Sequence, residues 1–359
     1  MSTAPLAPGT DRSRRPHRPL LCCAAVMAAL AVFCLLAMAV DDRMLLGESV
    51  WVKPLKFAVA FVLYTGTLAW LLSFPHRGRR LTWWMGTVFA VTGIVDVGFI
   101  VVQAARGTFS HFNLQADAYN QIGQKVFQSG VPGLFLANVI IVAVLSWQRI
   151  LDRPTSRAVH AGLFIAVAGM FLGYFMGFSG KQQVTDAYGR PVELVAGHTI
   201  VEGQPSVRDG VGGMPITGWS TVGGDMRIPH FAGLHGIQLL LLAVFALAWL
   251  GRTRVPWLRN ERARADLIWV LALGYAGLVG VLLWQALRGQ SLVHPDAATL
   301  AAFATLAAVM AAGAALVYLV RGRGTRANPA AAPSLPVAGT DVTQPIPAHL
   351  ISAAARHRA

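Results

Sequence analysis

Eight long apolar runs decide what this chain can fold into. They lie at about 20–40, 55–74, 82–104, 131–147, 159–179, 230–251, 265–286 and 297–320. Each run has roughly 17–23 residues, which is enough for a helix to cross a hydrocarbon core of about 30 Å. A helix also satisfies its own backbone hydrogen bonds in lipid. The sequence therefore predicts an all-α membrane protein, in which residues 20–320 form a bundle of eight transmembrane helices.

Basic residues are unevenly distributed between the connections. The two terminal segments and the second, fourth and sixth connections together carry 20 Lys and Arg against five acidic residues. The other connections carry ten of each kind. Because basic residues favour the cytoplasmic side, we expect both termini in the cytoplasm. Arginine outnumbers lysine 26 to 4, a bias typical of GC-rich bacterial genomes, so the predicted location is a bacterial plasma (inner) membrane.

The net charge of +14 does not indicate a nucleic-acid-binding protein, because the basic residues are spread between apolar runs. The expected partner is the lipid bilayer, and the oligomeric state is left open. The terminal segments 1–19 and 321–359 are rich in Pro and predict disorder. The first run ends in an Ala-Met-Ala that is typical of signal-peptidase sites, but its length favours a retained span.

Cysteine gives no sign of a disulfide framework or of a metal pair. The three cysteines, Cys22, Cys23 and Cys34, all lie in the first apolar run. Adjacent cysteines bridge poorly, and Cys34 is about three helical turns from Cys23. We interpret them as small apolar residues of a helix.

The first polar group on the predicted outer side is residues 51–57, Trp-Val-Lys-Pro-Leu-Lys-Phe. Pro54 suits the first turn of a helix. Trp51 and the lysines are typical of anchors at the membrane interface. The functional alternative is that Lys53 or Lys56 supplies a cation at the rim of a site.

The second group begins with Asp96, inside the third run. An acid there costs about 2.5–3.5 kcal/mol on insertion scales, so it must face other helices or water. Gln103 is seven positions later and on the same helix face, and Arg106, His111 and Asn113 follow. These residues predict a polar line rising to the outer surface, although Asp96 could simply bond a neighbouring helix. Residues 114–127 then predict a short amphipathic helix on the outer interface.

The third group is the connection at 180–229, one long extracytoplasmic loop rich in glycine. Connections of this length are usually functional or disordered. Near its end, Asp225 and Arg227 could pair with Arg106 or Asp117. His230, His235 and Gln238 follow, at the start of the sixth run.

The histidines allow several kinds of site. His111, His230 and His235 are the candidate ligands of a metal or haem, because all three fall at outer helix ends. On one ideal helix, however, His230 and His235 would lie about 140° apart and could not share a metal. Bonds to loop backbone and proton transfer with Asp96 are the alternatives.

Four segments together are similar to one protein family. They are WVKPLKF (51–57), QAARG (103–107), SHFN (110–113) and GGDMRIPHFAGLHGIQ (223–238). They resemble a family of uncharacterised bacterial multi-pass membrane proteins, and this resemblance implies no particular chemistry. The eight-span count is also similar to that of haem A synthases, but their Glu-x-x-His-Arg pattern is absent.

We therefore expect an extracytoplasmic-facing pocket that binds a small polar or anionic ligand. The alternatives are a proton-coupled transporter that uses Asp96, a haem- or metal-dependent membrane redox protein, and a membrane scaffold or sensor. Whether the pocket catalyses a reaction is open, because no motif of a known nucleophile or metalloenzyme is present.

Overall fold

The computed structural model of the protein describes residues 15–146, 148, 151–203 and 205–322. Most of the two tails predicted to be disordered therefore lies outside the described residues. Within these ranges, eight helices are long and apolar enough to cross a membrane. This finding confirms the predicted class, a helical bundle with eight candidate membrane spans.

The spans are formed by helices whose bounds differ by a few residues from the apolar runs. They are α1 (Arg18–Met38), α2 (Val52–Ser73), α3 (Arg79–Ala105), α4 (Ala118–Ser146), α5 (Arg153–Leu172) extended by the 3-10 helix η1 (Gly173–Phe178), α7 (Gly236–Thr253), α8 (Glu261–Leu287), and α9 (Ala297–Val317) extended by the π-helical turn η3 (Tyr318–Gly322). Two shorter helices are α6 (Arg227–Leu234) and η2 (Pro256–Arg259).

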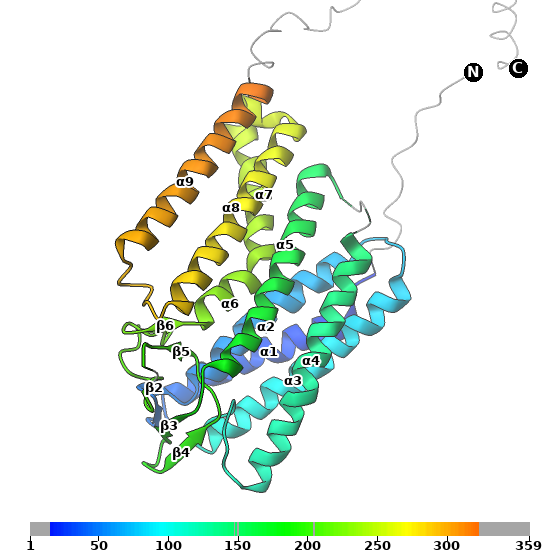
Figure 1. Cartoon of the computed structure of the whole chain (residues 1–359). Coiled ribbons are helices and arrows are strands. Elements are labelled where there is room, and N and C mark those ends of the chain that lie inside the picture. The colour runs from blue at the N-terminus through cyan, green and yellow to red at the C-terminus, as the bar shows by residue number, and fades with distance from the viewer. Residues whose placement is uncertain (1–14, 147, 149–150, 204, 323–359) are drawn as a thin grey trace, which may run out of the picture.

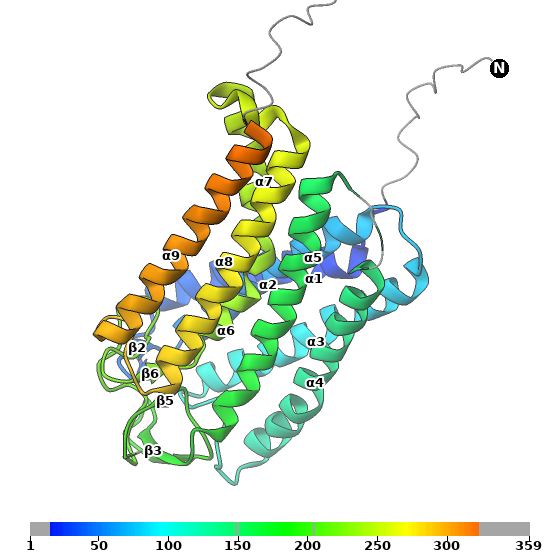
Figure 2. The same ribbon diagram turned by 45° about the horizontal axis from the view of Figure 1, so that its top comes forward.

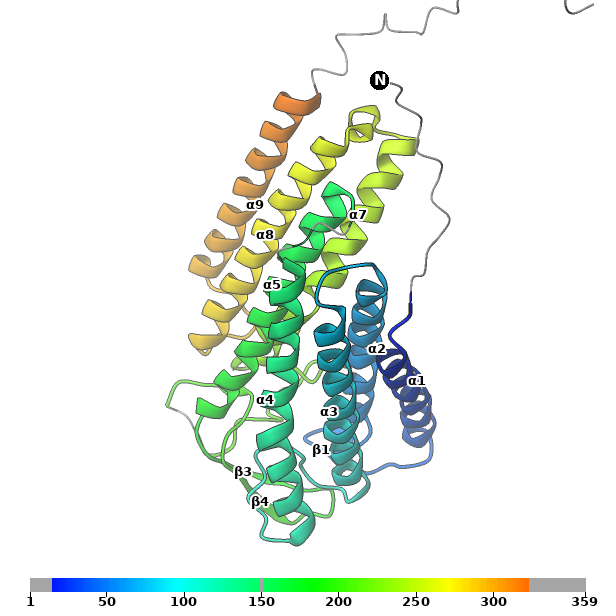
Figure 3. The same ribbon diagram turned by 90° about the vertical axis from the view of Figure 1, so that its right-hand side faces the viewer.

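The helices fall into two groups that follow chain order (Figure 1). In the first, α1 packs on α2 and α3, and α3 packs on α4. In the second, α5 contacts α6, α7 and α8. Contacts of α4 with α5 and of α2 with α7 join the groups. Figure 2 shows α9 along the edge of the bundle against α8, and Figure 3 shows α1 at the opposite edge.

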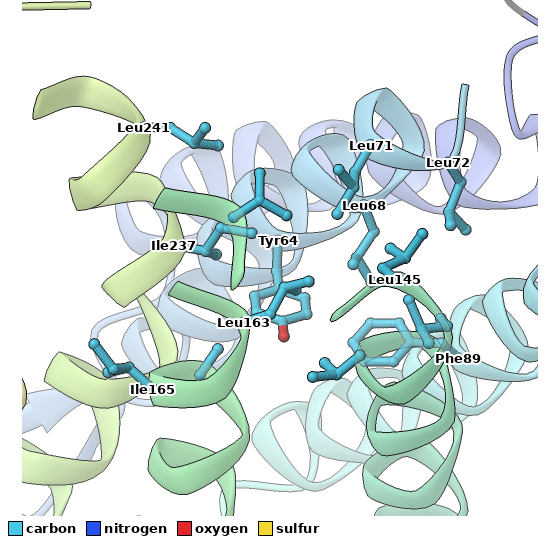
Figure 4. Close-up of a cluster of buried hydrophobic side chains, with 14 of the residues drawn as sticks. Tyr64, Leu68, Leu71, Leu72, Phe89, Leu145, Leu163, Ile165, Ile237 and Leu241 are labelled. Carbon is cyan, nitrogen blue, oxygen red and sulfur yellow. The ribbon is translucent and has the colours of Figure 1, made fainter. Parts of the chain in front are cut away.

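The main apolar core joins the two groups (Figure 4). It contains Tyr64 and Leu68 from α2, Phe89 from α3, Leu163 from α5 and Ile237 from α7, all at most 6% exposed. The rings of Tyr64 and Phe89 stack with centroids 5.5 Å apart. These contacts set the positions of α2 and α3, which carry several of the predicted site residues.

Glycine allows α5 and α6 to approach closely. A Cβ atom at Gly169 would lie 2.4 Å from the carbonyl carbon of Gly233 and 2.4 Å from the amide nitrogen of Leu234. A Cβ atom at Gly233 would lie 2.5 Å from Gly169 Cα. Small residues at helix interfaces let backbones meet in this way, so this contact fixes the position of α6.

Connections 39–51, 106–117 and 179–226 gather at one end of the bundle, here called the loop end (Figure 1). They contain three antiparallel pairs of strands: β1 (Met44–Leu45) with β2 (Glu48–Ser49), β3 (Gln182–Thr185) with β4 (Pro191–Leu194), and β5 (Thr199–Ile200) with β6 (Gly224–Asp225). A bridge between Asn113 and Leu194 joins connection 106–117 to β4. The long loop is therefore folded on its neighbours.

A buried arginine organises the long loop. Arg208 is 2% exposed, and its guanidinium donates to the carbonyl oxygens of Ser179, Gly180, Lys181 and Pro205 at 2.7–3.2 Å. These carbonyls include the residues just after η1, which the cation satisfies as they leave the helix. The end of the fifth span is thereby fixed to the middle of the loop.

The structure corrects the prediction of a short interfacial helix at residues 114–127. Residues from Ala118 onward are the first turns of α4, which continues without a break to Ser146. The buried face of this stretch consists of Asn120, Gly123 and Phe127, whereas Tyr119 and Ile122 of the apolar pattern are exposed on the outer side of α4. The sixth span also differs from the prediction, because the helix is interrupted at His235 into α6 and α7.

Candidate functional site

A cavity of about 660 Å³ lies at the loop end and reaches down between α2, α3 and α4. Six of the predicted site residues line it: Lys53, Asp96, His111, Arg227, His230 and His235. The other five, Gln103, Arg106, Asn113, Asp225 and Gln238, are outside its lining. The cavity thus divides the predicted set into a group that a ligand could touch and a group that supports the fold.

The polar line predicted from Asp96 to His111 is interrupted, because Gln103 and Arg106 belong to a separate network. Arg106 Nη1 donates to Gln103 Oε1 at 2.7 Å, and Gln103 Nε2 donates to Asn120 Oδ1 at 3.0 Å. Arg106 also forms an ion pair with Asp117 at 2.8 Å. Asn113 joins the same network by donating to Phe109 O at 2.9 Å. These bonds tie the end of α3 to the start of α4.

Asp225 and Arg227 pair with each other, and not with Arg106 or Asp117 as expected. Arg227 Nη2 lies 2.6 Å from Asp225 Oδ2 and also donates to Gly218 O at 2.6 Å. The charge of Arg227 is therefore balanced inside the loop. Gln238 is a further structural residue, because its amide donates to Thr67 Oγ1 at 3.3 Å and joins α7 to α2.

The two lysines at the start of α2 have different surroundings. Lys56 Nζ forms an ion pair with Glu48 at 2.9 Å and donates to Thr217 O at 2.7 Å. Lys53 lines the cavity in the first turn of α2, beside Pro54. Within the described part of the chain, its ammonium group has neither an ion pair nor a hydrogen bond. Lys53 is thus a cation that faces the cavity without a counter-charge of its own.

His111 and His230 are fixed in the cavity wall through Nδ1. His230 Nδ1 donates to Gly169 O at 2.7 Å, a bond that depends on the close approach of α5 and α6. His111 Nδ1 lies 3.0 Å from Ser110 Oγ, and its ring contacts Phe127 with centroids 4.3 Å apart. Burial lowers the pKa of His230 to about 4. Burial and the charge of Lys53 hold the pKa of His111 well below its ordinary value. Both rings are therefore neutral at pH 7.

A third histidine, His198, was missed by the sequence reasoning together with its partner, Asp209. His198 Nδ1 donates to Asp209 Oδ2 at 2.8 Å, and both residues line the cavity. The carboxylate also accepts from Gln182 Nε2 at 2.9 Å and from the backbone nitrogen of Thr199 at 3.0 Å. Burial alone would raise the pKa of Asp209, but His198 and these donors hold it well below its ordinary value. The only sequence signal was that both residues lie in the long glycine-rich loop.

The histidines of the described ranges do not form a metal cluster. Among the residues that the structure describes, no group of three or more His, Cys, Asp or Glu side chains is placed to hold a metal ion. His230 belongs to α6, whereas His235 is at the break between α6 and α7. The geometry thus gives no support to a metal site formed by His111, His230 and His235.

Asp96 lies deep in the cavity wall, on α3. Its side chain is buried, and Oδ1 has no hydrogen-bond partner in the described ranges. The carboxyl group lies against α4 where that helix has no side chain, since a Cβ atom at Gly130 would be 2.4 Å from Oδ1. Pro132 lies half a turn further along α4, where it cannot donate a helical backbone bond. Asp96 therefore marks a polar point within the apolar part of the cavity.

Comparison with known proteins gives no relative: no family model, no curated protein and no solved structure matches the chain.

Proposed function

We propose that the chain is a bacterial plasma-membrane protein that binds a small anionic ligand in this cavity, on the extracytoplasmic side. The observation that carries the proposal is Lys53, a cation in the cavity wall that is left unpaired by the described residues. The other two cations of the lining, Lys56 and Arg227, are balanced by Glu48 and Asp225. Lys53 is partly buried. A charge withdrawn from water is stabilised by a partner, and a bound anion would supply the partner of Lys53.

His230 indicates a ligand that carries hydroxyl groups as well as negative charge. Its ring donates through Nδ1 to the carbonyl oxygen of Gly169. In a neutral ring, Nε2 is then an acceptor. An acceptor in the wall of the same cavity as Lys53 suits an anion with O–H groups, such as a phosphate monoester. The side on which this site lies is supported by the charge count. The odd-numbered connections, three of which form the loop end, together carry ten basic and ten acidic residues, whereas the opposite set carries 20 basic and five acidic residues.

The test is anion-dependent stabilisation of the protein in nanodiscs of phosphatidylcholine. Inorganic phosphate, sulfate and acetate are added in turn, and the midpoint of thermal unfolding is measured. At least one anion should raise the midpoint of the wild type, because a ligand that binds only the folded state stabilises it. Lys53→Gln should lose this response. Lys125→Gln is the matched control, since Lys125 is exposed on α4 and outside the cavity lining. An equal response of all three proteins to every anion would refute the proposal.

A further inference from the structure

The cavity is longer than a small anion requires. Along α2 its lining extends from Lys53 to Tyr64, eleven residues further on. At a rise of 1.5 Å per residue, this separation is about 16 Å. A phosphate-sized group bound at Lys53 would occupy only the upper end, so the lower part must accommodate another portion of the ligand or a different molecule.

The lower part of the cavity is apolar. The lining there is made of aromatic and aliphatic side chains from α2, α3 and α4: Phe57, Phe61, Phe89, Val97, Phe127 and Leu134. Apart from Asp96, no charged residue of these three helices lines the cavity below Lys56. Because all three helices are candidate membrane spans, this part of the cavity lies at the depth of the hydrocarbon. It suits an alkyl or isoprenoid chain.

The cavity also reaches the side of the bundle. Several lining residues on α4 and η1 are exposed, including Val131, which is 38% exposed, and Tyr174, which is 37% exposed. Gln128 on α4 and Gly177 on η1 are also both lining and exposed. The ring of Tyr174 contacts that of Phe135 on α4, with centroids 5.8 Å apart. A side opening between two spans faces lipid, whereas an opening at the loop end faces water.

We infer that the ligand is an amphiphile of the surrounding leaflet, which enters between α4 and η1, places its anionic head at Lys53 and lays its apolar chain in the lower part of the cavity. This inference rests on the proposed function, because it uses Lys53 as the site of the head group. It adds the chemical class of the ligand and the route by which the ligand enters.

The test uses two probes with a related head, inorganic phosphate and dodecyl phosphate, on the protein in phosphatidylcholine nanodiscs. Thermal unfolding and the rate of ligand binding are measured for the wild type, for Val131→Trp, which fills the side opening, and for Leu136→Trp. Leu136 is the matched control, because it is on the same helix and 58% exposed but outside the cavity lining. Dodecyltrimethylammonium serves as a probe with the same chain length and the opposite charge.

We expect dodecyl phosphate to reach its half-maximal effect at a total concentration at least about tenfold below that of inorganic phosphate, because the bilayer concentrates it beside the opening. Val131→Trp should bind dodecyl phosphate at least about tenfold more slowly than the wild type and keep the response to phosphate, while Leu136→Trp keeps both the rate and the response. The cationic probe should give no stabilisation.

The possible failures are distinct. If phosphate stabilises the wild type and dodecyl phosphate acts no more strongly, the amphiphile inference is wrong and the proposed function stands. Equal rates of dodecyl phosphate binding to the two tryptophan variants would exclude entry between α4 and η1. If Lys53→Gln still responds to both phosphates as the wild type does, both the proposed function and the amphiphile inference are wrong.

Discussion

The contact between α5 and α6 gives the sharpest prediction about stability, which is the effect of Gly169→Ala. The new Cβ atom would lie 2.4 Å from two backbone atoms of α6, where ordinary contact begins at 3.4 Å. The two helices must therefore separate locally by about 1 Å. Overpacking of this kind costs about 1–3 kcal/mol. A loss of 2 kcal/mol lowers the ratio of folded to unfolded protein by a factor of about 30.

The matched control is Gly98→Ala, in the middle of α3. A Cβ atom at Gly98 meets nothing within 4 Å. Alanine is a better helix former than glycine by about 0.5–1 kcal/mol, so this variant should be equally or more stable. The two substitutions are chemically identical, and the difference between them isolates the helix contact.

The assay is the free energy of unfolding, measured by titration with a denaturing detergent in mixed micelles. Nitrogen-15 NMR of the histidines provides a second reading. Because His230 Nδ1 donates to Gly169 O at 2.7 Å, a separation of about 1 Å would break this bond and change the Nδ1 signal. If Gly169→Ala and Gly98→Ala have the same stability, and the His230 signal is unchanged, the close approach of α5 and α6 is refuted.

Three further predictions concern the loop end and the cavity. Asp209→Asn should lower the free energy of unfolding by about 1–3 kcal/mol, because an NH2 group replaces one of the two oxygens that accept from buried donors. Asp117→Asn, in a partly exposed ion pair, should cost less than about 1 kcal/mol. Denaturant titration compares the two variants. The pKa of His230 is about 4 in the folded protein and 6.5 ordinarily, so the folded state binds the proton more weakly, and stability should fall by about 3 kcal/mol as the pH drops from 6.5 to 4. His230→Gln should make this slope shallower, and an unchanged slope would show that another group causes it. Ala60→Phe, which fills the cavity two turns below Lys53, should weaken dodecyl phosphate binding about tenfold or more in the nanodisc assay. Val59→Phe, on the outer face of α2, should leave this binding unchanged.

The spans could be predicted because lipid imposes a simple rule, a long apolar helix for every crossing. The sequence was less informative at the ends of the spans. Residues 118–127 have the periodicity of an amphipathic helix, and an interface and a neighbouring helix impose the same pattern on a sequence. Only the unbroken continuation of the helix to Ser146 shows that these residues are the first turns of a span. The break at His235 lies where α6 and α7 both pack on α5.

The candidate site could be predicted where a single residue is unusual by itself. Lys53 and Asp96 were found because a charge beside or within an apolar run needs an explanation. His198 and Asp209 were missed because they are eleven residues apart in an irregular loop, and only the folded loop brings them together. The role of Arg208 could not be predicted for the same reason, since its four carbonyl partners come from two separate stretches of the connection.

The central claim is that the cavity holds an anion at Lys53, and native mass spectrometry tests it most directly. The wild type, Lys53→Gln and Lys125→Gln are purified from their membranes in the same mild detergent, and their bound small molecules are weighed and identified. The account predicts an anionic adduct on the wild type and on Lys125→Gln that is lost from Lys53→Gln. The same adducts on all three proteins, or only neutral and cationic ones, would contradict it.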